Sequence, residues 1–199
     1  MPIKKESTDF APTYEALVIG VSAGGLKALS AIIPSLPSDF PLPIVIVPHR
    51  KHETEDYLVS YLNKRSSLTV LSASIGAPIK QGCVYIAPSG YHLLIERDKT
   101  FSLSIDGKVN YSIPSIDILF DSAAIAYQET LIGLILTGAN NDGSLGLRSI
   151  NFYHGLSLVQ DPKSAEFSVM PQTAISTTHV NYILPLVDIS DFLIRLLME

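Results

Sequence analysis

A serine flanked by glycines stands where a predicted strand meets a predicted helix. Residues 20–25 read GVSAGG and begin within the last two residues of the apolar run ALVIGV, residues 16–21. Gly-x-Ser-x-Gly at such a junction is the pattern of a nucleophile elbow, whose sharp turn exposes the serine hydroxyl. The first free N–H groups of the following helix lie near the same point and could hold an oxyanion. Ser22 is therefore the candidate nucleophile.

Two other interpretations of this turn remain open. Ser22 could simply cap the helix that follows it. The turn could instead bind a dinucleotide, although the G-x-G-x-x-G fingerprint requires glycine where Ser22 stands. Asp39 lies at about the distance of a ribose-binding carboxylate, but in a proline-rich loop before the second strand rather than at its end.

A catalytic serine needs a base, and His49 is the candidate because it directly follows the apolar run 43–47. It lies 49 − 22 = 27 residues after Ser22, which is one strand–helix–strand crossover, so the two strands are expected to be neighbours. A zinc site of the H-E-x-x-H type is excluded, because Asp56 stands where the second histidine would be. His49 and His52 as a metal pair lack a third ligand in the sequence. Structural roles are expected for the remaining histidines, His92, His154 and His179.

The base needs a carboxylate, and Asp142 follows a third apolar run, residues 131–136. A buried carboxylate there could fix the imidazole tautomer and stabilise the imidazolium. Asn-Asp-Gly is also turn chemistry, so Asp142 could instead cap the next helix. The catalytic interpretation gains weight because Ser22, His49 and Asp142 each follow a predicted buried strand. Their order along the chain differs from that of α/β-hydrolases, in which the acid precedes the histidine.

The elements that would position these residues alternate between strand and helix, which predicts an α/β fold: a three-layer, doubly wound, mostly parallel sheet. Strands are expected at 16–21, 43–47, 68–73, 131–136, 156–159 and 182–184, and helices at 26–33, 55–64, 115–127, 144–153, 170–177 and 189–197. Ser115 and Asp188 are the expected caps of two of these helices. Three short runs at 83–87, 92–96 and 101–105 predict an antiparallel hairpin region.

Composition limits the functions open to the chain. It has 199 residues, 47% of them apolar, and a net charge of −5 without a Lys/Arg cluster, so a nucleic-acid binder is not expected. A single cysteine, Cys83, excludes an internal disulfide. No apolar run approaches the ~18 residues of a membrane helix, and the polar N-terminus is unlike a signal peptide. We expect a cytoplasmic protein with a mobile arm at 1–14 and one domain at 15–199.

The motifs together resemble the catalytic domain of the CheB-type chemotaxis receptor methylesterases, over roughly residues 16–197. The family's G-x-S-x-G-G corresponds to residues 20–25, its strand ending in histidine to residues 47–49, and its L-T-G-M-G-x-D-G to residues 136–143. Further family segments follow in order: YIAP at 85–88 with His92, Val109-Asn110, PSID at 114–117 and Met170-Pro171.

The resemblance implies an activity and a set of site residues. It implies a hydrolase that removes methyl groups from glutamate γ-methyl esters on the cytoplasmic helices of methyl-accepting chemotaxis receptors, and that can also deamidate receptor glutamine. Its triad would be Ser22, His49 and Asp142, with the backbone N–H groups of Ala23 and Ala139 as oxyanion-hole candidates and no metal or cofactor. Family members commonly carry an N-terminal receiver domain, and we expect none in this chain.

The chain also departs from the family pattern near the site. Ala23 replaces the usual threonine, Ala139 and Asn140 replace methionine and glycine, and the residues before PSID lack the usual arginines. Arg50 and Lys51 are the candidates for a positive substrate rim in their place. Two alternatives to receptor demethylation stay open: a catalytically silent module that binds receptors, and an esterase or amidase that acts on another substrate.

Overall fold

A parallel sheet of seven strands forms the centre of the structure, a computed structural model that describes residues 13–49 and 55–199. The strand order is β3-β4-β2-β1-β7-β8-β9, and every neighbouring pair in it is parallel. The strands are β1 (Ala16–Val21), β2 (Ile44–Pro48), β3 (Thr69–Ser72), β4 (Cys83–Ile86), β7 (Leu131–Ile135), β8 (Leu156–Gln160) and β9 (Tyr182–Leu184). Residues 1–12 of the predicted arm lie outside the described residues.

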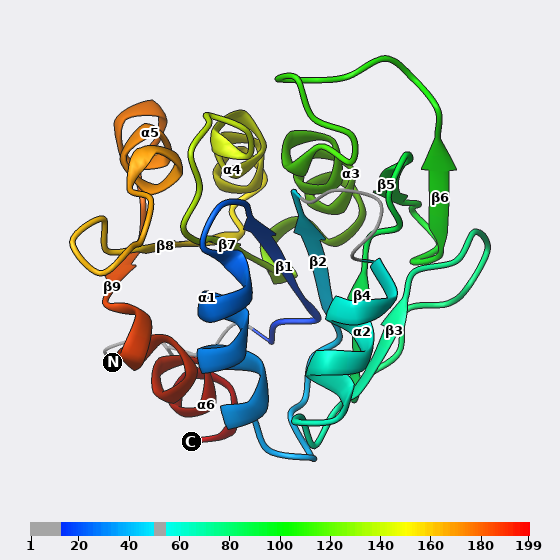
Figure 1. The fold of residues 1–199 in the computed structure, drawn as a ribbon, viewed down its shortest axis with the longest axis horizontal. Helices are drawn as coiled ribbons and strands as arrows, with labels where there is room; N and C mark the ends of the chain where they lie inside the picture. Colours follow the sequence, from blue (N-terminus) through cyan, green and yellow to red (C-terminus); the bar gives the residue numbers. More distant parts are fainter. Residues whose placement is uncertain (1–12, 50–54) are drawn as a thin grey trace, which may run out of the picture.

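Helices cover both faces of this sheet, which confirms the predicted three-layer α/β fold (Figure 1). One face carries α1 (Gly25–Ile32), α2 (Glu55–Asn63) and α6 (Ile189–Met198). The other carries α3 (Ile116–Tyr127), α4 (Ser144–Phe152) and α5 (Val169–Thr177). Within the described ranges, none of the helices combines the length and the apolar character needed to cross a bilayer.

The residues of β1 show why the sheet must be covered twice. Leu17, Ile19 and Val21 pack into the core on the α1 side, whereas Ala16 and Val18 pack into the core on the α3 side. All of these side chains are fully buried. Successive side chains of a strand point to opposite faces, so a continuous apolar run requires helices on both.

The antiparallel region is smaller than the sequence predicted. Segments 92–96 and 101–105 do pair as a hairpin, formed by β5 (His92–Ile95) and β6 (Phe101–Ser104). The prediction for 83–87 was wrong: it forms β4, a parallel strand of the main sheet between β2 and β3. A short apolar run between turn residues suits either arrangement, and the partners of β4 are set by long-range contacts that the run itself does not encode.

The two predicted caps are confirmed in position, because Ser115 is the N-cap residue of α3 and Asp188 that of α6, but neither side chain makes a capping hydrogen bond. Ser115 occupies the N-cap position of α3, but its hydroxyl makes no capping hydrogen bond. Asp188 precedes α6 at the end of a 3₁₀ turn and has helical backbone angles, φ −96° and ψ −10°. A capping side chain needs an extended backbone to reach the first N–H groups of its helix, and Asp188 lacks it.

The topology brings the carboxyl ends of β1, β2 and β7 to one edge of the sheet. The chain leaves β1 through α1 to reach β2 on one side, whereas β7 pairs with β1 on the other side. The chain therefore adds strands first on one side of β1 and later on the other, so the order of the strands in the sheet reverses at β1. Open α/β sheets bind ligands at such a switch point, beyond the carboxyl ends of the strands. The described residues that directly follow β1, β2 and β7 all lie at this edge.

Candidate active site

Backbone hydrogen bonds place the three candidate residues on adjacent loops. Ser22 directly follows β1, and its N–H donates to the carbonyl of Thr137 just beyond β7, at 3.0 Å. His49 directly follows β2, and its N–H donates to the carbonyl of Val21 at 2.9 Å. Asp142 lies in the loop that leads from β7 to α4. The strand register therefore gathers segments that are up to 120 residues apart in the sequence (142 − 22).

The imidazole of His49 is bonded directly to the carboxylate of Asp142. Nε2 lies 2.8 Å from Oδ2, and the two side chains are 11% and 0% exposed. An ionised carboxylate only accepts hydrogen bonds, so the ring nitrogen that faces it carries the hydrogen. In the neutral ring this leaves the lone pair on Nδ1. Asn140 Nδ2 lies 3.0 Å from Nδ1, and Ser112 Oγ lies 3.5 Å from it.

Four further donors converge on the Asp142 carboxylate. They come from the N-terminal end of α3 and the loop before it: the N–H of Ile116 at 2.6 Å, the N–H of Asp117 at 3.2 Å, the hydroxyl of Ser115 at 2.9 Å and Nδ2 of Asn110 at 3.2 Å. The positive end of the α3 dipole adds to this stabilisation. The alternative that Asp142 caps the following helix is wrong, since Gly143 holds that position in α4.

These contacts set the charge of Asp142. Burial alone would raise the pKa of this carboxyl, but hydrogen bonds from His49 and from the Ile116 N–H, with the charge of His49, lower the pKa to about 2. Asp142 is therefore an anion at neutral pH although its side chain is inaccessible to solvent. A buried carboxylate held in this way can orient an imidazole and stabilise its protonated form.

Asp117 has the opposite character, although it is a neighbour of Asp142. Burial raises the pKa of Asp117, a hydrogen bond from the Gly146 N–H partly offsets this, and the negative charge of Asp142 raises it again, so that the resulting pKa is about 6. Gly146 N donates to Oδ1 at 2.7 Å, and Asn110 Nδ2 donates to Oδ2 at 2.8 Å. Asn110 therefore bridges the two carboxyl groups, because the same amide nitrogen reaches Asp142.

The turn that holds Ser22 differs from both alternatives suggested by the sequence. Gly24, with φ +78°, is the N-cap of α1, so Ser22 is not the cap. Asp39 precedes β2 and therefore lies at the opposite edge of the sheet, which rules out its use as a ribose ligand beside Ser22. Within the described part of the chain, the Ser22 hydroxyl makes no hydrogen bond.

Ser22 and His49 open into one cavity of about 260 Å³. Its remaining lining comes from α1, the end of β2 and α2, and is mostly apolar: Gly25, Leu26, Leu29, Pro48, Tyr57 and Leu58. Gly138 packs directly against Ser22. A Cβ at position 138 would lie 3.0 Å from the Ser22 Cβ and 1.9 Å from the sulfur of Met170. Only glycine fits at that position beside Ser22.

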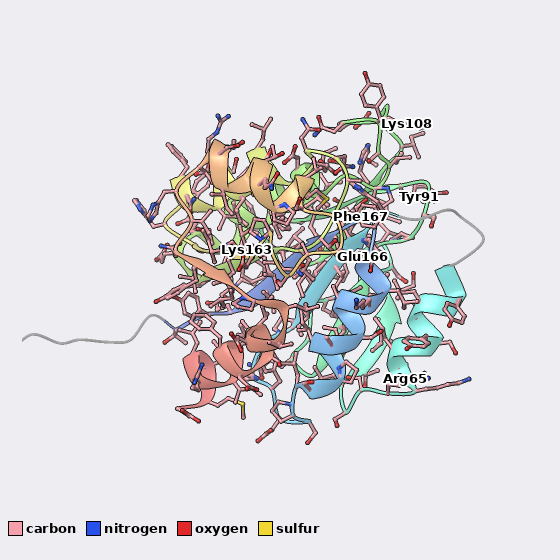
Figure 2. The ribbon with its side chains drawn as sticks, turned by 60° about the vertical axis from the view of Figure 1, so that its left-hand side comes forward. Arg65, Tyr91, Lys108, Lys163, Glu166 and Phe167 are labelled. Carbon is pink, nitrogen blue, oxygen red and sulfur yellow. The ribbon has the colours of Figure 1, made fainter. Side chains whose placement is uncertain are left out.

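A second cavity, of about 280 Å³, adjoins His49 and has a different lining. It is formed by the segment between β6 and α3, through Lys108, Tyr111, Ser112 and Ile113. Figure 2 shows Lys108 at the outer end of this segment and Glu166 and Phe167 on the loop between β8 and α5. Because Lys108 lines the same cavity as His49, it places a positive charge in this second cavity. The predicted rim residues, Arg50 and Lys51, lie outside the described residues.

The oxyanion-hole candidates lie in the two loops that flank Ser22. Ala23 is half-buried between β1 and α1, and Ala139 is exposed between β7 and α4. Among the residues that the structure describes, the N–H of neither alanine donates to a protein acceptor. Residues 13–49 and 55–199 contain no group of three or more His, Cys, Asp or Glu side chains arranged to hold a metal ion.

Sequence reasoning assigned no role to several residues that contact the His49–Asp142 pair, among them three whose side chains lie within 3.2 Å of it. Asn110 and Ser115 bond to the carboxylate, and Asn140 bonds to the imidazole. Asn110 and Ser115 lie in segments that the family resemblance had already marked, which was the available signal. Asn140 stands two residues before Asp142, but its spacing alone does not indicate that its amide turns toward a histidine on another loop.

Comparison with known proteins gives a consistent result. The family model described as CheB methylesterase matches residues 17–193. A protein of Leptospira interrogans, whose name provisionally assigns it protein-glutamate methylesterase and protein-glutamine glutaminase activities, is 50% identical over 183 residues, covering 92% of this chain and 95% of the relative. The crystal structure of the Thermotoga maritima CheB methylesterase catalytic domain superimposes with a TM-score of 0.89 at 37% identity, covering 92% of this chain and 99% of that one.

Other relatives are longer than this chain. The protein-glutamate methylesterase/protein-glutamine glutaminase of Thermotoga maritima is 37% identical over 90% of this chain, and the one of Archaeoglobus fulgidus is 34% identical over 91%. In both cases the matched region spans 53% of the relative, about half of its length.

Proposed function

The chain belongs to the CheB methylesterase family, and on this premise we propose that it hydrolyses glutamate γ-methyl esters on the cytoplasmic helices of chemotaxis receptors. One observation of the site carries the proposal: an imidazole bonded to a buried carboxylate opens into the same cavity as a serine at a strand-to-helix turn. Relatives named for a second activity, protein-glutamine glutaminase, support deamidation of receptor glutamine at the same site.

In this proposal Ser22 is the nucleophile, His49 the base and Asp142 the acid. Because Nε2 is bonded to Asp142, the base atom is Nδ1. The Ser22 oxygen attacks the ester carbonyl carbon, and its proton passes to Nδ1. The N–H groups of Ala23 and Ala139 hold the oxyanion, and Asp142 stabilises the imidazolium.

The tetrahedral intermediate formed by this attack breaks down to an acyl-serine, which water then hydrolyses. The bond to the methoxy oxygen breaks, and Nδ1 returns its proton to that oxygen, which releases methanol and leaves an acyl-serine. Water repeats the sequence on the acyl group, giving glutamate and regenerating the Ser22 hydroxyl. With glutamine as substrate the leaving group is ammonia. No step requires a metal ion or a cofactor.

The test measures methanol released from a methyl-esterified receptor fragment. We expect Ser22→Ala and His49→Ala to abolish release, because each removes an atom that takes part in bond making or proton transfer. Two residues outside the cavity lining provide matched controls: Ser30→Ala, half-buried on α1, and His179→Ala, exposed before β9, should retain activity. Equal rates for Ser22→Ala and Ser30→Ala would show that the assigned nucleophile is wrong.

A fluorophosphonate probe separates this proposal from the two alternatives. Only an activated serine reacts with the probe, so labelling that disappears in Ser22→Ala excludes a catalytically silent receptor-binding module. Labelling without methanol release from the receptor fragment would favour an esterase or amidase with another substrate. A comparison of small esters with the receptor fragment then decides between these two hydrolases.

A further inference from the structure

Asn140 occupies the nitrogen that the proposed reaction needs. Its Nδ2 lies 3.0 Å from His49 Nδ1. Its orientation is set from the other side, because the Asp142 N–H donates to Asn140 Oδ1 at 3.3 Å. The oxygen of the amide therefore faces Asp142, and its N–H₂ group faces the ring.

In the neutral His49 ring, Asn140 and the Ser22 hydroxyl compete for the same nitrogen, Nδ1. His49 donates from Nε2 to Asp142, so the neutral ring has one remaining lone pair, on Nδ1. Asn140 donates into that lone pair, and the Ser112 hydroxyl lies near it at 3.5 Å, the limit of a hydrogen bond. Among residues 13–49 and 55–199, which the structure describes, the Ser22 hydroxyl has no hydrogen-bond partner, although Ser22 lines the same cavity as His49.

We propose that Asn140 is a positioning residue that restrains the reaction by occupying the lone pair of His49 Nδ1 until substrate binds. This inference rests on the proposed function. One lone pair cannot accept an N–H from Asn140 and take the proton of Ser22 at the same time. Once Nδ1 is protonated it becomes a donor, and a donor cannot face the amide N–H₂ group. The Asn140 contact must therefore break before or during proton transfer.

The first test compares the rate at which a small fluorophosphonate labels Ser22 in the wild type, Asn140→Ala and Asn140→Gly. Removing the amide should raise this rate about two- to tenfold, the factor that corresponds to one net hydrogen bond. Asn141→Ala is the matched control, because that side chain is exposed and only its backbone carbonyl is bonded. Its rate should equal that of the wild type.

The second test is independent of catalysis and follows the nitrogen resonance of His49 Nδ1 by NMR. In Asn140→Ala this resonance should move toward the position of a ring nitrogen without a hydrogen bond, whereas Asn141→Ala should leave it in place. A purely structural role for Asn140 would change the unfolding temperature without this selective shift.

The possible outcomes separate this inference from the proposed function. Wild-type labelling at Ser22 with no acceleration in either Asn140 variant, or an unchanged Nδ1 resonance, overturns the role of Asn140 and leaves the hydrolase intact. Labelling of none of the proteins refutes the hydrolase and, with it, any role of Asn140 in the reaction. Faster labelling together with the shifted resonance supports the inference.

Discussion

Replacing Asp142 by asparagine should remove activity and stability together. Two donors, the His49 ring and the Ile116 N–H, face Oδ2, and three others face Oδ1. An amide has one acceptor oxygen and one N–H₂ group. Whichever way the new amide turned, its N–H₂ group would therefore face at least two donors at a position that solvent does not reach.

The expected loss of stability follows from the pKa of Asp142. The folded value is about 2 against 3.8 for the free group, so the folded state favours the charged carboxyl by about 2 kcal/mol at neutral pH. A lowered carboxyl pKa contributes stability that is present above about pH 4 and is lost as the pH falls toward 2. Asp142→Asn should therefore unfold at least about 2 kcal/mol more easily at pH 7 but differ little from the wild type near pH 2.

The expected loss of catalysis comes from the imidazole. Without the anion, nothing stabilises the imidazolium, and an amide N–H₂ group turned toward the ring would favour the tautomer that has no lone pair on Nδ1. Comparable substitutions in Ser-His-Asp sites lower kcat by a factor of about 10⁴. Methanol release would give the kinetic effect, and urea unfolding at pH 7 and near pH 2 would give the stability. Retention of activity within tenfold in folded Asp142→Asn would refute the assigned role of Asp142.

Two further predictions concern the packing and charge around the site. Gly20→Ala places a Cβ 2.4 Å from Ile116 Cγ2, an overpacking expected to cost about 1–3 kcal/mol in urea unfolding and to lower kcat by displacing the N-terminal end of α3. Gly107→Ala, with open space around it, is the control, and equal stability of the two variants would contradict the packing argument. Asp117, with its pKa raised to about 6, disfavours ionisation in the folded state, so wild-type stability should fall as the pH rises from about 4 to about 6. Over this window Asp117→Asn should gain up to about 3 kcal/mol relative to the wild type; parallel stability curves for the two proteins would count against the burial argument.

The sequence contains enough information for the parts of the fold that depend on local pattern. The run 16–21 is apolar at every position, which predicts a strand buried on both faces, and β1 is fully buried. The alternation of strands and helices predicts parallel pairing, and β1 does lie beside β2. The side-by-side loops of Ser22 and His49 follow from this pairing, because both residues come directly after their strands.

The remaining features depend on contacts between distant segments. Residues 83–86 carry the same local pattern as a hairpin strand, and their parallel pairing is decided by β2 and β3. Ser115 precedes a helix, which predicts a cap, yet a buried anion from another loop competes for its hydroxyl at 2.9 Å. The charged acceptor wins because hydrogen bonds to an ion are about twice as strong as those between neutral groups.

The hydrogen bonds of the Asp142 carboxylate explain why much of the site could not be predicted from the sequence. A buried anion must have its lone pairs satisfied, and the donors available at this edge of the sheet belong to α3, to the loop before it and to His49. Meeting that requirement also fixes the His49 ring, since one of the donors is Nε2. The same carboxylate therefore serves folding and catalysis. Its charge holds three chain segments together, and it would also stabilise an imidazolium. A site built in this way is oriented before substrate arrives, so little reorganisation remains for the reaction itself.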